Sequence, residues 1–434
     1  MLSAAIYALR AIPARPGRWD DRPKAASSPR APAAQPAVAG KQIELAELLI
    51  AREPSRPDAY NLLGAACLQK ARETGDFSFN ARAERAINRS LELDPNNIES
   101  RILHATLLLA QHRFKEALES ARRAERERPR DPVIFGILTD ALVELGDYDN
   151  ARIAADRMLT LRPDVSSYAR VSYLRSLYGD GEGAIEAMRA AVRAAGPREP
   201  ESLAWCRVHL GDELLNAGRI IEAEREYDLA LGVFPDYHIA LAAKARARIA
   251  AGDFTSAIEN YKRAQQRVPL PDTAMALGDL YKKTGREDEA NRQYELVEFI
   301  ERAGAAGTGT YSRQMALFRA NQGIDLDEAL EAAMRERSLR SDIYTCDTLA
   351  WCLLKTGRVE EAIKAIKEAM RLGTRDAQIF YHAGMIYAAA GDRSNAAKHL
   401  SRALEINPSF DLLQSGIAKQ TLDNIGGQGS LYEK

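Results

Sequence analysis

The sequence predicts an all-α protein built as a solenoid of repeated helix-turn-helix units. Glycines recur five residues before alanines along much of the chain, and the alanines that continue this phase are spaced 33, 34 or 39 residues apart. A repeat of that length is too short for an independent domain and is typical of stacked helical hairpins. The alanines are Ala83, Ala117, Ala151, Ala184, Ala223, Ala257, Ala290, Ala329, Ala362 and Ala396.

The glycines and prolines punctuate each unit in the same order. A glycine just past a helix end adopts the left-handed conformation without a steric penalty, so each glycine is expected to close a first helix. A proline twelve residues after several of the alanines is expected to end the second helix. The glycines are Gly146, Gly179, Gly218, Gly252, Gly285, Gly357 and Gly391, and the prolines are Pro95, Pro129, Pro163, Pro235, Pro269 and Pro408.

Apolar residues follow a helical period on both sides of each turn. Before the turn, Tyr60, Leu63 and Cys67 lie on one face of a predicted first helix. After it, Ala223, Tyr227 and Ala230 alternate small and large side chains. An aromatic ring of one helix is therefore expected to pack against a small residue of its neighbour.

These small, aromatic and proline positions resemble the tetratricopeptide repeat, a 34-residue helix-turn-helix unit. The resemblance covers about residues 58–408 as ten units, and it is weakest around Ala329. It implies a right-handed superhelix in which first helices line a concave face and second helices lie outside. It also implies a non-catalytic protein that binds protein partners.

Insertions interrupt the period at 72–80, 196–200 and 304–310. We expect longer loops there. They either decorate the surface or divide the solenoid into segments, and the glycine-rich loop at 304–310 is the better hinge. The segments would be 58–197, 201–302 and 311–408.

Short helices are expected to cover both ends of the solenoid, because an uncovered last unit would expose apolar surface. Residues 41–57 form the predicted N-terminal cap and residues 409–425 the C-terminal cap, followed by a loose tail at 426–434. The residues expected to face the solenoid are Leu45, Leu48 and Leu49 in the first cap and Phe410, Leu413 and Ile417 in the second.

Residues 1–40 differ from the rest of the chain. They hold six of the 18 prolines, and six basic residues against two acidic ones. Such a segment buries no core and is expected to be a disordered arm. A remnant of an export signal or anchor, or a transit peptide, is the alternative, so the predicted localisation is cytoplasmic by default and exported or envelope-associated otherwise.

The composition excludes several classes of protein. Hydrophobic residues at 46% and charged residues at 28% indicate a folded chain, and no apolar run approaches the roughly 18 residues of a membrane span. The net charge is -1, and the body beyond residue 40 is mildly acidic, which argues against nucleic acid. The four cysteines are predicted to be free thiols.

No catalytic, cofactor or metal motif is recognisable. The phosphate-binding loop, the nucleophile elbow and the zinc-protease motif are all missing, and no two of the six histidines stand at a helical ligand spacing. The prediction is therefore a protein without enzymatic activity, cofactor or metal.

The middle first helices carry the most chemically mixed side chains of the expected concave groove. Arginine and aromatic residues are frequent anchors in binding grooves, although an ordinary solvated face is the competing interpretation. The lysine and asparagines with which some relatives bind chaperone tails have no counterpart, because Asn61 and Ala65 occupy the matching positions. The candidate groove residues are Arg170, Tyr173, Trp205, His209, Asp212 and Arg246.

We therefore expect a non-catalytic scaffold that binds an extended peptide or a helix of a protein partner. Two alternatives remain at this stage: an envelope-associated assembly or secretion component, and a regulatory subunit of an enzyme on a separate chain. The identity of the partner and the oligomeric state are not predicted, because repeat proteins of one fold differ in ligand.

Overall fold

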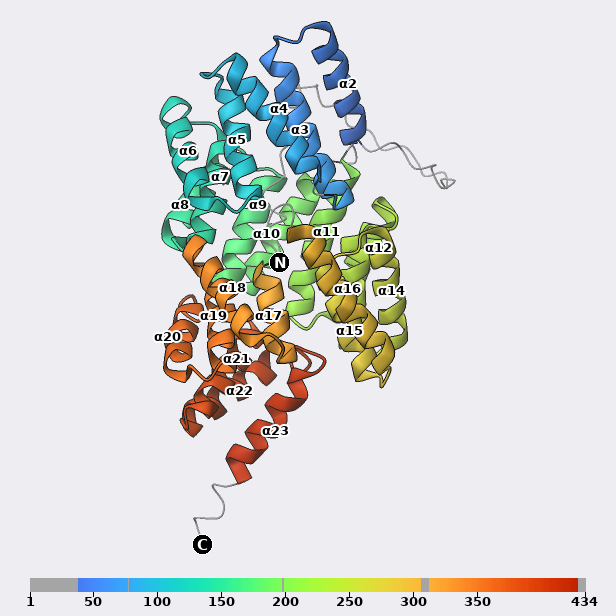
Figure 1. Ribbon diagram of the computed structural model, residues 1–434, viewed down its shortest axis with the longest axis vertical. Coiled ribbons are helices and arrows are strands. Elements are labelled where there is room, and N and C mark those ends of the chain that lie inside the picture. Colours follow the sequence, from blue (N-terminus) through green and yellow to red (C-terminus); the bar gives the residue numbers. More distant parts are fainter. Residues whose placement is uncertain (1–37, 77, 197–198, 306–311, 428–434) are drawn as a thin grey trace.

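The computed structural model describes residues 38–76, 78–196, 199–305 and 312–427, and the regular elements within these ranges are all helices. They follow one another as antiparallel hairpins that stack into an α-solenoid (Figure 1). The first helices of the hairpins are α3 (Pro57–Thr74), α5 (Ile98–Ala110), α7 (Pro132–Glu144), α9 (Val165–Leu177), α11 (Pro200–Asn216), α13 (His238–Ala250), α15 (Pro271–Lys283), α17 (Ser312–Gln322), α19 (Ile343–Lys355) and α21 (Ala377–Ala389). The second helices are α4 (Ser78–Leu93), α6 (Phe114–Glu127), α8 (Tyr148–Leu161), α10 (Gly181–Ala194), α12 (Ile220–Val233), α14 (Phe254–Arg267), α16 (Glu287–Ala305), α18 (Leu326–Leu339), α20 (Val359–Ala369) and α22 (Arg393–Ile406). Two further helices flank them, α2 (Val38–Arg52) and α23 (Gln414–Gly427).

The alanine positions of the sequence pattern are close helix contacts, as predicted. All ten, from Ala83 to Ala396, are completely buried. The pairing of large and small residues is also confirmed, because the ring of Tyr227 fills the space where a side chain at Gly211 would stand. Tyr294 lies over Gly278 in the same way. In these hairpins, and in those of Gly64 with Ile87 and Gly384 with Leu400, a ring or aliphatic side chain of the second helix is seated on a glycine of the first.

The insertions lengthen helices more than loops. The expected loop at 72–80 is wrong, because α3 continues to Thr74 and α4 begins at Ser78. Helix α3 has 18 residues, α11 has 17 and α16 has 19, whereas α5 and α7 have 13. Of the other two expected loops, residues 197–198 and 306–311 lie outside the described residues.

The two flanking helices differ from expectation in the faces that they bury. In α2 the buried residues are Ala39, Ile43 and Ala46, while Leu45 and Leu48 are 50% and 61% exposed. The helix therefore packs with its small residues on α3. The prediction was wrong because leucine content was taken as the guide to the inner face, whereas close packing of α2 on α3 favours the alanine side.

The C-terminal helix is shorter than predicted. It begins at Gln414, and Ile417 on it is 45% exposed. Its C-terminal part packs on α22, where Arg393 donates a hydrogen bond to the carbonyl oxygen of Ile425. The residues before it, including Phe410, are not helical and take a different course, described below.

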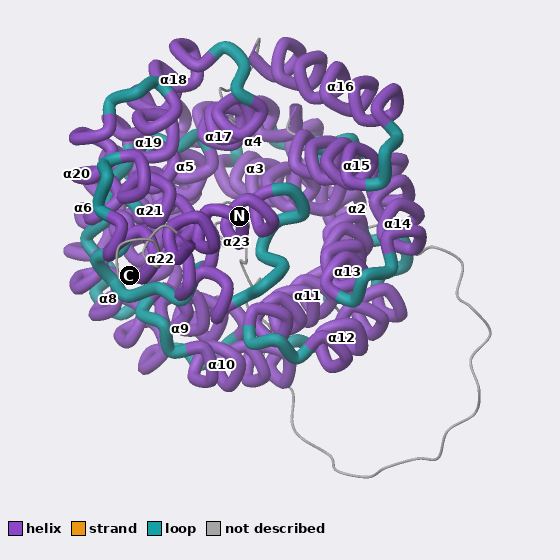
Figure 2. The backbone as a smooth tube through the Cα atoms, turned by 90° about the horizontal axis from the view of Figure 1, so that it is seen from below, coloured by secondary structure: helices purple, strands orange, loops and turns teal. Residues whose placement is uncertain are grey.

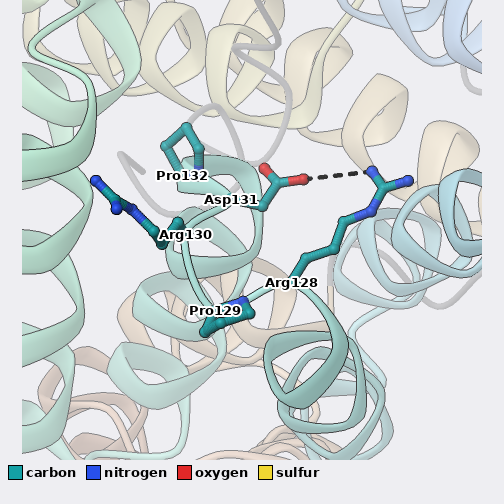
Figure 3. A pocket seen from close by; sticks show the side chains of 5 residues that line it. All are labelled: Arg128, Pro129, Arg130, Asp131 and Pro132. Atoms are coloured by element: carbon teal, nitrogen blue, oxygen red, sulfur yellow. Dashed lines mark ion pairs between the residues drawn. The ribbon is translucent and has the colours of Figure 1, made fainter.

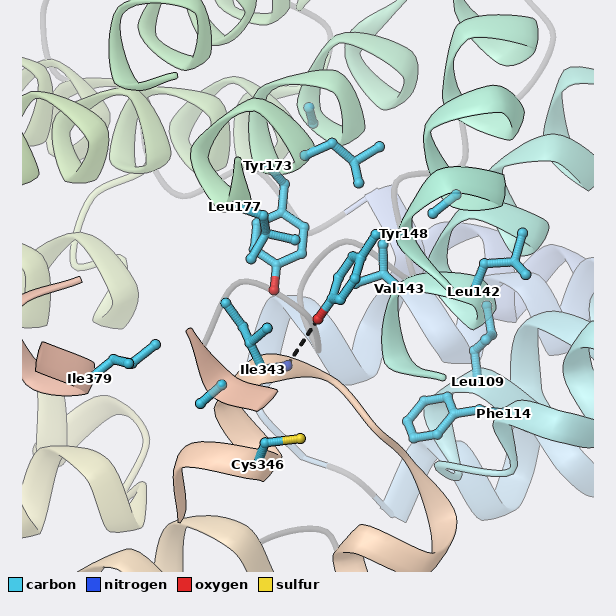
Figure 4. Packing of buried hydrophobic residues seen from close by; sticks show 14 of the residues in the cluster. Leu109, Phe114, Leu142, Val143, Tyr148, Tyr173, Leu177, Ile343, Cys346 and Ile379 are labelled. Carbon is cyan, nitrogen blue, oxygen red and sulfur yellow. Dashed lines mark hydrogen bonds between the residues drawn. The ribbon is translucent and has the colours of Figure 1, made fainter. Parts of the chain in front are cut away.

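Successive turns of the superhelix contact each other through residues about 195 apart in the sequence. Ser341, in the connection between α18 and α19, donates its backbone N–H to the carbonyl oxygen of Glu144 at 2.8 Å. The backbone N–H of Ile343 donates to the hydroxyl of Tyr148 at 2.9 Å (Figure 4). Farther along, Thr374 donates to the carbonyl oxygen of Leu177. Successive turns of the superhelix therefore pack directly on each other, and the structure has a continuous core across this contact.

The predicted arm at 1–40 lies almost wholly outside the described residues, as does the tail beyond Gly427. In the part of the chain that is described, no helix has the length and apolarity needed to span a membrane.

Candidate functional site

The candidate site is the concave face, which we define as the surface of the first helices that is turned toward the axis of the superhelix. In the view along this axis the first helices form the inner ring and the second helices the outer ring (Figure 2). The expectation that first helices line the inside is thus confirmed. What the face can bind depends on which of its side chains the fold itself does not use.

Many polar side chains of the first helices bond to one another from one hairpin to the next. These bonds join residues about 30 to 43 apart in the sequence, so they hold neighbouring hairpins together. A polar residue at a concave position is therefore often structural. The pairs are Arg170 with Asp140, Ser176 with Glu213, Arg246 with Asp212, Gln322 with Asp279, Trp351 with Asn321, and His382 with Asp347.

Two of the six predicted groove residues are deeply engaged in the fold. Arg170 donates from Nε and Nη2 to the two carboxylate oxygens of Asp140 at 2.9 and 2.6 Å, and both side chains are nearly inaccessible. Tyr173 is buried beside Leu177 at the contact between the superhelical turns (Figure 4). Both side chains contribute to internal packing.

Trp205 and His209 lie one turn apart on α11 with their rings 3.9 Å from centroid to centroid. Both residues are more than nine-tenths buried. The indole Nε1 of Trp205 and both ring nitrogens of His209 are buried without a hydrogen-bond partner in the described ranges. Asp212 Oδ2 lies 3.7 Å from His209 Nδ1, beyond hydrogen-bond distance. Such groups are rare in folded proteins and destabilise the chain by about 1–3 kcal/mol each. Burial lowers the pKa of His209 to about 4, so its ring is neutral at pH 7.

Asp212 and Arg246 continue this surface from α11 to α13. Arg246 Nη2 donates to Asp212 Oδ1 at 2.6 Å, and the hydroxyl of Tyr227 donates to the same oxygen at 2.9 Å. The side chain of Arg246 is 36% exposed, which makes it the accessible charge of the group. We call Trp205, His209, Asp212 and Arg246 the α11/α13 patch. The structure brings these four predicted residues together.

Glu213 is a buried acid next to the patch and gives a test of the packing between α9 and α11. It accepts a hydrogen bond from Ser176 at 3.1 Å, and burial raises its pKa to about 7. The pKa of Glu213 in the folded chain lies above the ordinary value of about 4.5. The contribution of Glu213 to the stability of the folded chain is therefore fully present below pH 4.5 and is lost as the pH rises through 7. We expect Glu213→Gln to raise the free energy of unfolding by roughly 1–3 kcal/mol at pH 8.

At pH 5 the same substitution is expected to change little, because Glu213 is then already protonated. Urea denaturation of both proteins at pH 5 and pH 8 measures the difference. The buried histidines titrate equally in both proteins, so their effect on stability cancels when the two proteins are compared at the same pH. An equal effect at the two pH values would show that Glu213 is not protonated in the folded chain at pH 5.

Sequence reasoning missed the residues around Asn321. This side chain on α17 accepts from Trp351 Nε1 and from Gln414 Nε2, both at 2.8 Å. The insertion at 304–310 disturbs the repeat just before this helix, so the period did not place Asn321 on the concave face. Gln414 was assigned to the C-terminal cap, and nothing in its spacing indicated a contact with a residue 93 positions earlier.

A surface pocket outside the concave face lies at the connection between α6 and α7 (Figure 3). The five lining residues are consecutive, from Arg128 in this connection to Pro132 at the start of α7, and Arg128 already pairs with Glu99 and Asp131. A pocket formed by five consecutive residues, with Arg128 and Asp131 already paired, indicates no binding site of its own.

Metal and thiol chemistry have no visible basis in the described ranges. No three His, Cys, Asp or Glu side chains converge there to hold a metal ion. The four cysteines are free, as predicted, and buried. Burial raises the pKa of Cys346 to about 11 and that of Cys352 to about 12, so both thiols are protonated at pH 7.

Comparison with known proteins agrees with this architecture. The family model described as tetratricopeptide repeat matches residues 102–166, 209–270, 242–298 and 348–409, together half of the chain. The chain belongs to the tetratricopeptide repeat family. The tetratricopeptide fold supports protein-interaction scaffolds, and members of the family bind protein partners.

Individual relatives are distant. The chain is 25% identical to rat (Rattus norvegicus) DnaJ homolog subfamily C member 3 over 219 residues, which are 46% of this chain and 42% of that protein. It is 22% identical to cellulose synthase operon protein C of Escherichia coli K12 over 320 residues, 69% of this chain and 26% of that protein. The chain thus spans less than half the length of these curated relatives.

Among solved structures, a human IFIT1 dimer with m7Gppp-AAAA matches with a TM-score of 0.50 and 18% identity, covering 77% of each chain. At this identity the likeness concerns the fold alone.

Proposed function

We propose that this tetratricopeptide repeat protein is a scaffold that binds an extended peptide or a helix of a protein partner on its concave face, with the α11/α13 patch as the principal contact. One observation supports the patch above other parts of the face. Three buried ring nitrogens of Trp205 and His209 have no hydrogen-bond partner among the described residues, next to an accessible cation at Arg246. The nearest charged group to His209 is Asp212, whose Oδ2 lies 3.7 Å from Nδ1.

A protein ligand matches these groups chemically. These nitrogens are covered in the free chain, so we propose that binding moves the side chains over them aside. Backbone carbonyl oxygens of the partner then accept from the indole N–H of Trp205, and either backbone group pairs with the neutral ring of His209. An acidic side chain or carboxylate of the partner suits Arg246. Satisfying buried polar groups that are otherwise unpaired contributes to affinity, because their cost is already present in the free chain.

The test exchanges the two charged residues of the patch, so that an ion pair between them can still form. In Asp212→Arg/Arg246→Glu the ion pair between α11 and α13 is retained with reversed polarity. Because the swap removes the acceptor of the Tyr227 hydroxyl, circular dichroism and thermal melting must first show that the double variant is folded. We expect the folded double variant to lose its protein partner by at least tenfold. Capture of partners from source cells by residues 38–434 of the wild type and the variant, read by quantitative mass spectrometry, measures this loss.

The matched control is the swap Arg101→Glu/Glu127→Arg. It exchanges an Arg–Glu pair between α5 and α6 whose charged atoms are 2.6 Å apart, far from the patch in sequence. This control is expected to retain the partner. Equal retention by both swaps would contradict the assignment of the patch, and equal loss would indicate a nonspecific effect of reversing charges.

A further inference from the structure

Residues 408–414, which we call the strap, connect α22 to α23 across the concave face. The ring of Phe410 lies 5.2 Å from that of Tyr381 on α21. Leu412 packs against the hydrophobic cluster formed by α13 to α16. Gln414 Nε2 donates to Asn321 on α17 at 2.8 Å. The strap therefore contacts first helices on both sides of the superhelix, and α23 then lies across the middle of the ring in the axial view (Figure 2).

The contacts of the strap are those of a peptide in a groove. An aromatic and an aliphatic side chain enter apolar surface, and an amide side chain bonds to an amide on the wall. Its residues from Phe410 to Leu413 remain only partly buried, so they are not part of the solenoid core.

One contact opposes the seating of the strap. Asp411 accepts backbone hydrogen bonds from Leu413 and Gln414 at 2.8 and 2.7 Å, which hold its carboxylate in place. It is close enough to Asp279 on α15 for the two charges to interact, and Asp279 is itself held by Tyr294 and Gln322. Burial raises the pKa of Asp279, and the charge of Asp411 raises it further. Repulsion between the two carboxylates weakens the binding of the strap to the concave face.

We propose that the strap is a built-in ligand that occupies the concave face between α15, α17 and α21, and that a protein partner extending over these helices must displace it. This inference rests on the proposed function, since it concerns the same concave face beside the α11/α13 patch. The surface under the strap then fits a short peptide that carries an aromatic residue and, two positions later, a leucine or similar side chain.

A tethered ligand competes at high effective concentration. A short connection to α22 holds the strap near its site at an effective concentration on the order of millimolar, which suppresses binding of the same peptide added from outside. Substitutions that release the strap remove this competition and leave the site open.

The experiment titrates a fluorescein-labelled peptide of residues 406–417 against the full chain and against the full-length variant Phe410→Ala/Leu412→Asp. Fluorescence anisotropy is expected to show binding to the variant at least tenfold tighter than to the wild type. A peptide carrying the same two substitutions is expected not to bind. The control protein Ile417→Asp, altered at an exposed position of α23, is expected to behave as the wild type.

Equal binding of the wild-type peptide to both proteins, or binding to neither, would overturn the proposal. If circular dichroism shows that the double variant has lost helix, Leu412→Ala replaces it in the same titration. No natural partner is present in this experiment. Its failure would therefore remove the strap proposal and leave the proposed function standing, whereas partner retention by the charge-swapped protein would contradict the α11/α13 patch without changing the result of the peptide titration.

Discussion

Replacing Arg340 with methionine is expected to lower the free energy of unfolding by about 3–5 kcal/mol. Arg340 lies at the contact between successive turns of the superhelix, where its guanidinium is 3.2 Å from Glu144 and 2.7 Å from Glu336. All three side chains are almost completely buried. Methionine keeps much of the volume but leaves both carboxylates in the interior without their common cation, and a buried charge without its counterion is strongly destabilising.

Urea denaturation followed by circular dichroism measures the loss, and hydrogen exchange locates it. The amides of Ser341 and Ile343, which bond to the preceding turn, are expected to exchange faster in the variant. Arg358→Met provides the comparison, because Arg358 pairs with Glu361 on the surface. Surface ion pairs contribute little to stability, so the urea midpoint of Arg358→Met is expected to equal that of the wild type. Equal midpoints for both variants would mean that the contact between turns does not form.

Replacing Gly146 with alanine is expected to destabilise the chain by about 2–4 kcal/mol. Gly146 ends α7 with φ 76°, a conformation that is unfavourable for alanine. A Cβ atom at this position would also lie 2.6 Å from the carbonyl oxygen of Ser341 in the next superhelical turn. Backbone cannot move aside as a side chain can, so the overlap adds to the conformational strain.

Gly252→Ala separates these two effects. Gly252 has φ 78° at the equivalent turn between α13 and α14, but nothing lies within 4 Å of an added Cβ atom. We expect this control to cost about 1 kcal/mol from conformation alone. The difference between the two thermal or urea midpoints therefore measures the close approach of the turns. Indistinguishable midpoints would contradict the packing described for Gly146.

The hairpins could be predicted because their determinants are local. A glycine, an alanine five residues later and a proline twelve residues after that specify where each helix ends and where it packs, and the burial of Ala257 and its equivalents confirms this. The closure of the superhelix could not be predicted in this way. It joins residues about 195 apart, such as Tyr148 and Ile343, and depends on small rotations that accumulate over several hairpins.

The candidate site was predictable in part for the same reason. Helical spacing places Trp205, His209 and Asp212 on one face of α11, and the repeat places Arg246 beside them. Spacing did not reveal that Arg170 forms a buried ion pair with Asp140 on the preceding first helix, because that pairing depends on the distance between hairpins. The sequence pattern did not predict the strap, because an irregular segment has no period from which its position could be extrapolated.

The most direct test of the central claim is the indole N–H resonance of Trp205 in a ¹⁵N-tryptophan-labelled chain, assigned with Trp205→Phe. In the free protein this N–H has no hydrogen-bond acceptor within the part of the chain that the structure describes. Binding of the captured partner at the α11/α13 patch is expected to shift the resonance and slow its exchange with water. A saturated complex in which the Trp205 resonance is unchanged would contradict the claim that the partner binds there.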